Sequence, residues 1–121
     1  MARILLLEDN SNMRDAINEA LFMHQHEVET APNGREGIQI IESGKFNPEI
    51  IVTDLKMPQV SGEELLRMVK ANPKFQNISI IVMSGSPIDE QKVMAAGADA
   101  FILKPFKHAE LEEIIQRLMQ K

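Results

Sequence analysis

The sequence predicts an α/β fold in which five parallel strands form one doubly wound sheet with helices on both faces. Short apolar runs alternate five times with longer amphipathic stretches, and the runs are almost continuously apolar. Strands of that kind are buried on both faces. With 121 residues, the chain is long enough for one domain with a single core. The expected strands are Ile4–Leu7, His26–Thr30, Glu49–Asp54, Ile78–Met83 and Asp99–Leu103.

The first helix is expected to begin after Asn10 with Ser11 as its N-cap, because a serine hydroxyl can accept a hydrogen bond from a backbone N–H of the first turn. Helical spacing then places Ile17, Ala20 and Leu21 on one buried face. The strand that follows this helix has mixed polarity, which is typical of a sheet edge.

The second and third helices have clear start signals. Asn33 and Glu36 resemble a capping box, and Gly44 can end the second helix in a left-handed conformation. The segment Ser61–Glu64 contains a full capping box for the third helix. The positions of this helix expected to face the core are Leu65, Leu66 and Val69.

The fourth helix is expected to start with Ser86 as N-cap and Pro87 at the first helical position, where a missing N–H costs nothing. Gly97 ends it. A final helix is expected over Lys107–Met119.

Composition excludes several classes of function. The net charge of −5 disfavours direct nucleic-acid binding, which needs a basic surface. The chain has no cysteine, so it can form neither disulfides nor thiolate zinc sites. No apolar run approaches the roughly 20 residues of a membrane span. We therefore expect a cytoplasmic protein without a membrane contact.

Five polar residues stand at or just beyond the ends of four expected strands: Glu8, Asp9, Asp54, Ser84 and Lys104. Parallel strands end at one edge of their sheet, and ligands bind there at the point where strand order reverses. Each residue alone has an ordinary explanation as a capping, loop or surface group. Their joint occurrence at four strand ends indicates one site.

The chemistry of this set points to phosphoryl transfer. Three carboxylates at one rim repel each other, and a hard divalent cation such as Mg²⁺ relieves the repulsion with oxygen ligands. Asp54 can then act as a carboxylate nucleophile. Lys104 supplies an ammonium and Ser84 a hydroxyl for the phosphoryl oxygens.

Other polar residues are interpreted as surface groups. The histidines show no spacing that unites them as ligands, and they are expected on the surface: His24, His26 and His108. The acidic residues of the last helix are expected on its solvated face: Glu110, Glu112 and Glu113.

A family resemblance runs through nearly the whole chain, in Glu8-Asp9, Asp54 with Met57-Pro58 and Gly62, Ser84-Gly85, Ala96-Gly97-Ala98, and Phe101 with Lys104-Pro105-Phe106. On these motifs the chain resembles response-regulator receiver domains of two-component signalling, in particular those similar to the chemotaxis regulator. The resemblance implies a flavodoxin-like (βα)5 fold with strand order 2-1-3-4-5. We expect a single receiver domain over residues 1–121, with no output domain in this chain. The alternative is a receiver fragment of a larger regulator or hybrid kinase.

The same resemblance assigns roles in the site. It makes Asp54 the phosphoacceptor and Mg²⁺ the cofactor. Asp9 and Asp54 would bind the metal directly, Glu8 would bind it through water, and Lys56 would offer its backbone carbonyl.

The resemblance also implies a switch. Ser84 and Lys104 would contact the phosphoryl group, and the Lys104–Pro105 bond would be cis. Phe101 would be the switch residue, moving inward when Ser84 is drawn to the phosphoryl oxygens. Family members often have threonine and tyrosine at these two positions, so a switch at Phe101 works by packing alone.

The implied partners are a sensor histidine kinase or histidine phosphotransfer protein, and a downstream effector protein or domain. The effector would bind the face of helix four, strand five and helix five, and one option is a phosphorylation-dependent dimer through that face. The domain would catalyse only its own phosphorylation and dephosphorylation.

Two other functions fit the chain less well. A hydrolase of the haloacid-dehalogenase type needs a second aspartate two residues after the nucleophile, where this chain has Lys56. A flavin or nucleotide carrier needs a first loop that cradles phosphate. Here that loop reads Glu8-Asp9-Asn10, which repels phosphate unless a cation intervenes.

Overall fold

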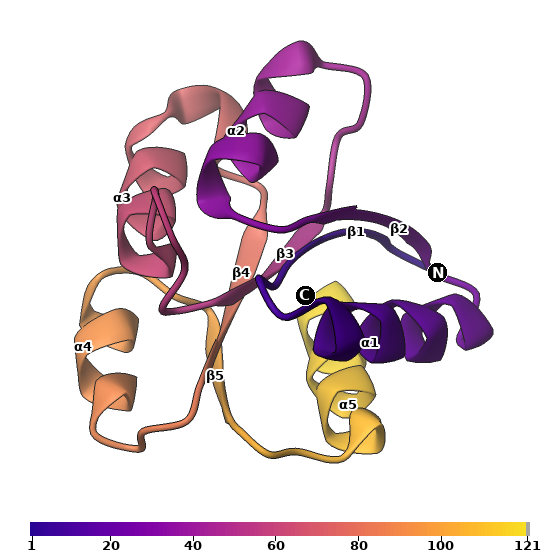
Figure 1. Cartoon of the computed structure of the whole chain (residues 1–121). Coiled ribbons are helices and arrows are strands. Elements are labelled where there is room, and N and C mark those ends of the chain that lie inside the picture. Colours follow the sequence, from indigo (N-terminus) through magenta and orange to yellow (C-terminus); the bar gives the residue numbers. More distant parts are fainter. Residues whose placement is uncertain (121) are drawn as a thin grey trace.

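The computed structural model describes residues 1–120, which form one five-stranded parallel sheet with helices between the strands (Figure 1). The strand order is β2-β1-β3-β4-β5, which confirms the expected topology. The strands are β1 (Arg3–Leu7), β2 (Glu27–Ala31), β3 (Ile50–Asp54), β4 (Ser79–Ser84) and β5 (Ala100–Leu103). The helices are α1 (Ser11–Met23), α2 (Gly34–Ser43), α3 (Gly62–Ala71), α4 (Asp89–Ala95) and α5 (His108–Met119), with a short 3₁₀ turn at Pro73–Phe75.

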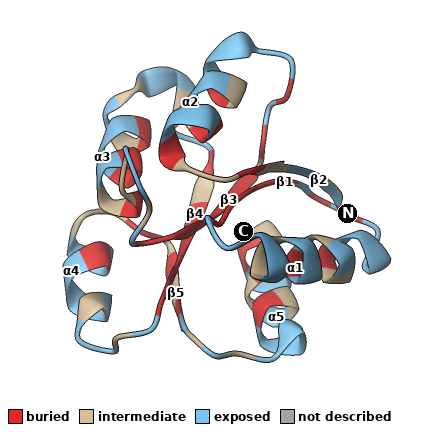
Figure 2. Ribbon diagram, viewed as in Figure 1, coloured by how far each residue is buried: buried red, intermediate tan, exposed pale blue. Residues whose placement is uncertain are grey.

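Two cores fill the two faces of the sheet. Figure 1 shows α1 and α5 on one face and α2, α3 and α4 on the other. Successive side chains of a strand point to opposite faces, so Ile4 and Leu6 pack with α1 and α5, while Leu5 and Leu7 pack under α2 and α3. The central strands are therefore buried along their length, as their apolar runs predicted (Figure 2).

The helix starts follow their capping residues, with one shift. Asn33 caps α2, Ser61 and Glu64 form the capping box of α3, and Gly44 ends α2 at φ 73°, as expected. The N-cap of α1, however, is Asn10 rather than Ser11. The Asn10 side-chain oxygen accepts the N–H of Met13 at 2.9 Å. Asparagine is as good an N-cap residue as serine, so the cap can lie one residue earlier than expected.

The predicted start of α4 is wrong. The helix begins at Asp89, and no side chain caps it. Ser86 and Pro87 instead form a turn, in which their carbonyls accept the N–H groups of Asp89 and Glu90. The N–H of Ser86 points back to the Ser84 hydroxyl at 3.1 Å, so Ser86 belongs to the loop that closes over the end of β4.

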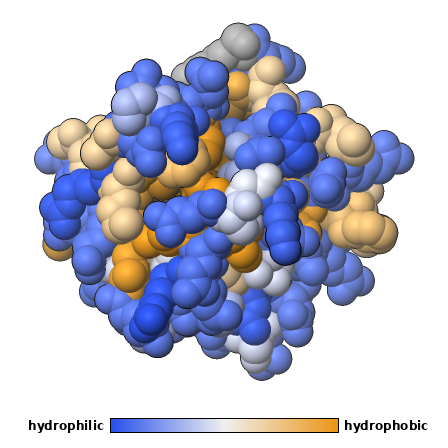
Figure 3. Space-filling model, turned by 90° about the horizontal axis from the view of Figure 1, so that it is seen from above, coloured by the Kyte–Doolittle hydropathy of each residue, from blue (hydrophilic) through white to orange (hydrophobic). Residues whose placement is uncertain are grey.

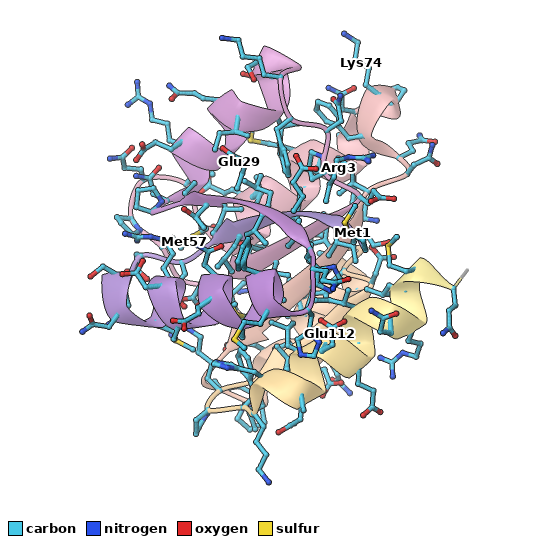
Figure 4. All side chains as sticks on the ribbon, turned by 90° about the vertical axis from the view of Figure 1, so that its right-hand side faces the viewer. Met1, Arg3, Glu29, Met57, Lys74 and Glu112 are labelled. Carbon is cyan, nitrogen blue, oxygen red and sulfur yellow. The ribbon has the colours of Figure 1, made fainter. Side chains whose placement is uncertain are left out.

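His26 and Glu112 are not surface residues of the kind that the sequence suggested. His26 is only 4% exposed, and its Nδ1 accepts the N–H of Ala2 at 3.0 Å. Its Nε2 therefore carries the hydrogen, which it donates to the Glu112 carboxylate at 2.8 Å. Glu112 lies on α5 near the C-terminal end of α1 (Figure 4), so the pair joins α5 to the start of the sheet.

The surface is polar over much of its area. Seen from above, it is mainly hydrophilic, with hydrophobic side chains in smaller areas between (Figure 3). Within residues 1–120, no helix combines the length and the apolar character needed to cross a membrane.

Candidate functional site

The strand ends bring the candidate residues to one edge of the sheet. Glu8 and Asp9 directly follow β1, and Asp54 is the last residue of β3. Ser84 is the last residue of β4, and Lys104 directly follows β5. The first connection leads from β1 to its neighbour β2, and the next connection crosses back to β3 on the other side of β1. The strand order therefore reverses between β1 and β3. The site therefore lies where α/β sheets of this kind bind ligands.

Lys104 connects two of the carboxylates across the rim. Its ammonium donates to Glu8 Oε1 at 2.8 Å and to Asp54 Oδ2 at 3.0 Å. Partial burial by itself lowers the pKa of Lys104, but the hydrogen bonds and charges of Glu8 and Asp54 outweigh it, and the pKa is raised above its ordinary value. The lysine is thus held in its charged form beside Asp54.

Three carboxylates form a group that can hold a cation. Among residues 1–120, oxygens of Glu8, Asp9 and Asp54 lie within 4.8 Å of one another. Glu8 is 1% exposed, and its other oxygen accepts the N–H of Asn10 at 3.1 Å, so both of its oxygens already have partners. Asp9 is exposed. The oxygens free to bind an ion therefore come mainly from Asp9 and Asp54, and oxygen donors of this kind suit Mg²⁺.

The backbone around Asp54 is held from several sides. The Thr53 hydroxyl donates to the Asp54 carbonyl at 3.0 Å, and the N–H of Leu55 donates to the Met83 carbonyl at 2.9 Å. Gly62 donates its N–H to the Leu55 carbonyl at 2.8 Å. A Cβ at Gly62 would overlap the Asp54 carbonyl oxygen, so the turn after β3 requires glycine at this position.

Ser84 lies in the site, but its hydroxyl is engaged elsewhere. It is 5% exposed and lines, with Asp54 and Lys56, a hollow of about 350 Å³. The hydroxyl donates to Asp89 Oδ2 at 2.7 Å rather than to a group at Asp54. Phe101 is half-buried on β5 and packs against the core under α2, α3 and α4.

Asp89 is the residue near the site that sequence reasoning missed. It is the first residue of α4 and contacts Ser84 across the β4–α4 loop. The periodicity of the sequence does not predict this contact. Ser84 ends a strand and Asp89 starts a helix, so the distance between them depends on the irregular loop that joins the two elements. The Lys104–Pro105 peptide, by contrast, is cis, as the motif implied.

Comparisons with known proteins give matches over nearly the whole chain. Residues 4–116 match the family model described as the response regulator receiver domain. The sensor histidine kinase TmoS of Ectopseudomonas mendocina is 33% identical over 97% of this chain, which corresponds to 12% of that protein. The chain spans about half or less of the length of the curated relatives that it matches.

Solved structures of similar length resemble the whole chain. The chemotaxis response regulator CheY4 of Vibrio cholerae is 29% identical with a TM-score of 0.87, and the match covers 98% of both chains. The response regulator TrrA of Thermotoga maritima, solved in complex with Mg²⁺ and beryllium fluoride, is 30% identical with a TM-score of 0.87. That match covers 98% of this chain and 99% of TrrA.

Proposed function

The chain belongs to the response regulator receiver domain family of two-component signalling, and on that premise we propose that it is a switch controlled by phosphorylation of Asp54. The observation that carries the proposal is the contact of one ammonium, Lys104, with Asp54 and Glu8 beside the exposed Asp9. A nucleophilic carboxylate, a cation-binding group of oxygens and a fixed positive charge are the parts that phosphoryl transfer needs.

In the proposed reaction, an Asp54 oxygen attacks the phosphorus of a phosphohistidine on a sensor kinase or phosphotransfer protein. The O–P bond forms as the P–N bond breaks, and the imidazole leaves and takes up a proton. Lys104 stays charged next to Asp54 because its pKa is raised, so its ammonium can stabilise the negative charge on the transferred oxygens. Self-catalysed loss of the phosphoryl group, by attack of water on the same phosphorus, completes the proposed cycle.

Mg²⁺ fits the donor set of this site and would neutralise part of the charge that collects there during transfer. We propose Asp9, Asp54 and the backbone carbonyl of Lys56 as its protein ligands. Glu8 would act through water, which agrees with the hydrogen bonds that both of its oxygens already make. The complex of TrrA with Mg²⁺ and beryllium fluoride supports this choice of metal.

The output of the switch is proposed to be a change on the face formed by α4, β5 and α5. A phosphoryl group in the hollow beside Asp54 offers Ser84 new acceptor oxygens. Rotation of the Ser84 side chain toward it leaves space beside β5, and Phe101 can turn inward to fill that space. An effector protein or domain, or a second copy of the chain, would then recognise the altered face. A cytoplasmic location belongs to the same proposal.

The test is phosphorylation by a small donor. With acetyl phosphate and Mg²⁺, intact-mass measurement should show one added phosphoryl group on the wild-type chain and none on Asp54→Asn. Digestion and peptide mass analysis should place it on Asp54. Glu29→Gln, a carboxylate change on the edge strand β2, serves as a control and should accept the group as the wild type does. Modification that persists in Asp54→Asn would overturn the assignment.

A further inference from the structure

The hydroxyl of Ser84 has a partner that the proposed switch does not explain. Ser84 Oγ donates to Asp89 Oδ2 at 2.7 Å, the short distance of a charge-assisted hydrogen bond. The same oxygen accepts the N–H of Ser86 at 3.1 Å. Ser86 also offers its carbonyl oxygen, but at 3.5 Å it is a much poorer acceptor. The single hydroxyl hydrogen therefore goes to Asp89.

The backbone of Ser84 is fixed, whereas the start of α4 is weakly held. Ser84 pairs with Leu103 in the sheet, and its carbonyl accepts the N–H of Lys104 at 2.8 Å. In contrast, α4 has seven residues and no side-chain N-cap, and its first turn depends on two carbonyls of the preceding loop. The Ser84–Asp89 hydrogen bond thus joins the uncapped start of α4 to the end of a strand that is held in the sheet.

Asp89 stands next to the place where a phosphoryl group would arrive. It lines a hollow of about 270 Å³ together with Leu55 and Lys56. These two residues also line the hollow that contains Asp54 and Ser84. A dianionic group on Asp54 would offer Ser84 a stronger acceptor and would repel the nearby carboxylate of Asp89.

We propose that Asp89 is a positioning residue that holds Ser84 in the unphosphorylated arrangement and competes with the phosphoryl group for its hydroxyl hydrogen. The proposal rests on the proposed phosphorylation of Asp54. Phosphorylation then has two linked effects, because capture of the Ser84 hydrogen also releases the first turn of α4. The Ser84–Asp89 contact stabilises only one of the two states, so it lowers the affinity of the domain for any ligand that requires the other.

The test compares two neighbouring acidic residues of one helix turn. Asp89→Ala removes the contact, whereas Glu90→Ala removes the same charge from an exposed position in the first turn of α4. Beryllium fluoride with saturating Mg²⁺ is the probe, titrated while backbone amide signals are followed. Asp89→Ala should bind it at least roughly tenfold more tightly than the wild type, since loss of one hydrogen bond to a charged group shifts the balance by about that factor or more. Glu90→Ala should match the wild type within about twofold, and Asp89→Asn should fall between, because a neutral amide accepts more weakly.

A second measurement uses the ligand-free protein. Ser84→Ala breaks the same contact from its other side, so amide signals of residues 86–93 should move in the same direction in Ser84→Ala and Asp89→Ala. The double variant should show the same amide chemical-shift changes as each single variant. If Asp89 acted independently of Ser84, the changes of the two single variants would instead add in the double variant. Asp89→Asn keeps the shape of the side chain and replaces Asp89→Ala in this comparison if the alanine variant does not fold.

The outcomes separate this inference from the function on which it rests. If beryllium fluoride binds in an Asp54-dependent way but Asp89→Ala and Glu90→Ala behave alike, the role of Asp89 is refuted and the phosphorylation site stands. Additive movements in the double variant refute it as well. If the wild type binds no beryllium fluoride, both proposals fall.

Discussion

At the rim of the sheet, one ammonium faces three carboxylates. Lys104 is shared between Glu8 and Asp54, and Asp9 has no ammonium within the hydrogen bonds and ion pairs that residues 1–120 form. The Arg14 guanidinium donates to the Glu8 backbone carbonyl at 2.9 Å and to no carboxylate among residues 1–120, so the three carboxylates carry more charge than Lys104 balances. This excess of negative charge explains why the site should attract Mg²⁺. It also explains why removal of one carboxylate should reduce the electrostatic repulsion within the ion-free protein.

Asp9→Asn tests this electrostatic argument. Without Mg²⁺, the variant should be slightly more stable than the wild type, by up to about 1 kcal/mol, because one of three close like charges is gone. With millimolar Mg²⁺, amide signals near Asp54 should shift in the wild type and stay in place in the variant. Urea unfolding and the metal titration measure the two effects, with Asp15→Asn, an exposed position on α1, as the control. Equal Mg²⁺ responses in variant and wild type would rule out Asp9 as a ligand.

At the scale of single elements, the sequence was a good guide wherever local chemistry decides the structure. The capping residues of α2 and α3 and the apolar runs of the strands were predicted correctly, since each depends on neighbours in sequence. The start of α4 was not, because Ser86 and Pro87 lie in a turn whose carbonyls accept the N–H groups of Asp89 and Glu90, and the helix begins only after that turn. The burial of His26 also escaped prediction, because its partner Glu112 is 86 residues away in sequence.

The His26–Glu112 pair should contribute to the stability of the fold. His26 is buried, so Glu112→Ala leaves its Nε2–H without its acceptor, and loss of such a partner costs about 1–3 kcal/mol. Glu113→Ala, at an exposed position next to it, should change the free energy of unfolding by less than about 0.5 kcal/mol. Chemical denaturation of both variants measures the difference. Equal stabilities would mean that the buried histidine finds another acceptor, such as water.

At the scale of the whole molecule, the candidate site and the buried His26–Glu112 pair lie at opposite ends of the sheet. Figure 4 shows Met57, in the loop after β3, at one end and Arg3, at the start of β1, at the other. The candidate site occupies the first end, and the His26–Glu112 pair fastens α5 at the second. In the proposed switch, the half of α5 near the site, together with β5 and α4, responds to a change at Asp54. The position of the site followed from sequence, whereas the contact between Ser84 and α4 required the structure.

The central claim is that a phosphoryl group at Asp54 reshapes the face of α4, β5 and α5, and amide signals with and without beryllium fluoride test it most directly. In Mg²⁺, the wild type should show shifts in the loops of the site and also along α4, β5 and the start of α5, reaching Phe101 and Lys107. Asp54→Asn should show neither set. Wild-type shifts confined to the loops around Asp9, Asp54 and Ser84 would contradict the claim, because the site would then bind its ligand without switching the surface.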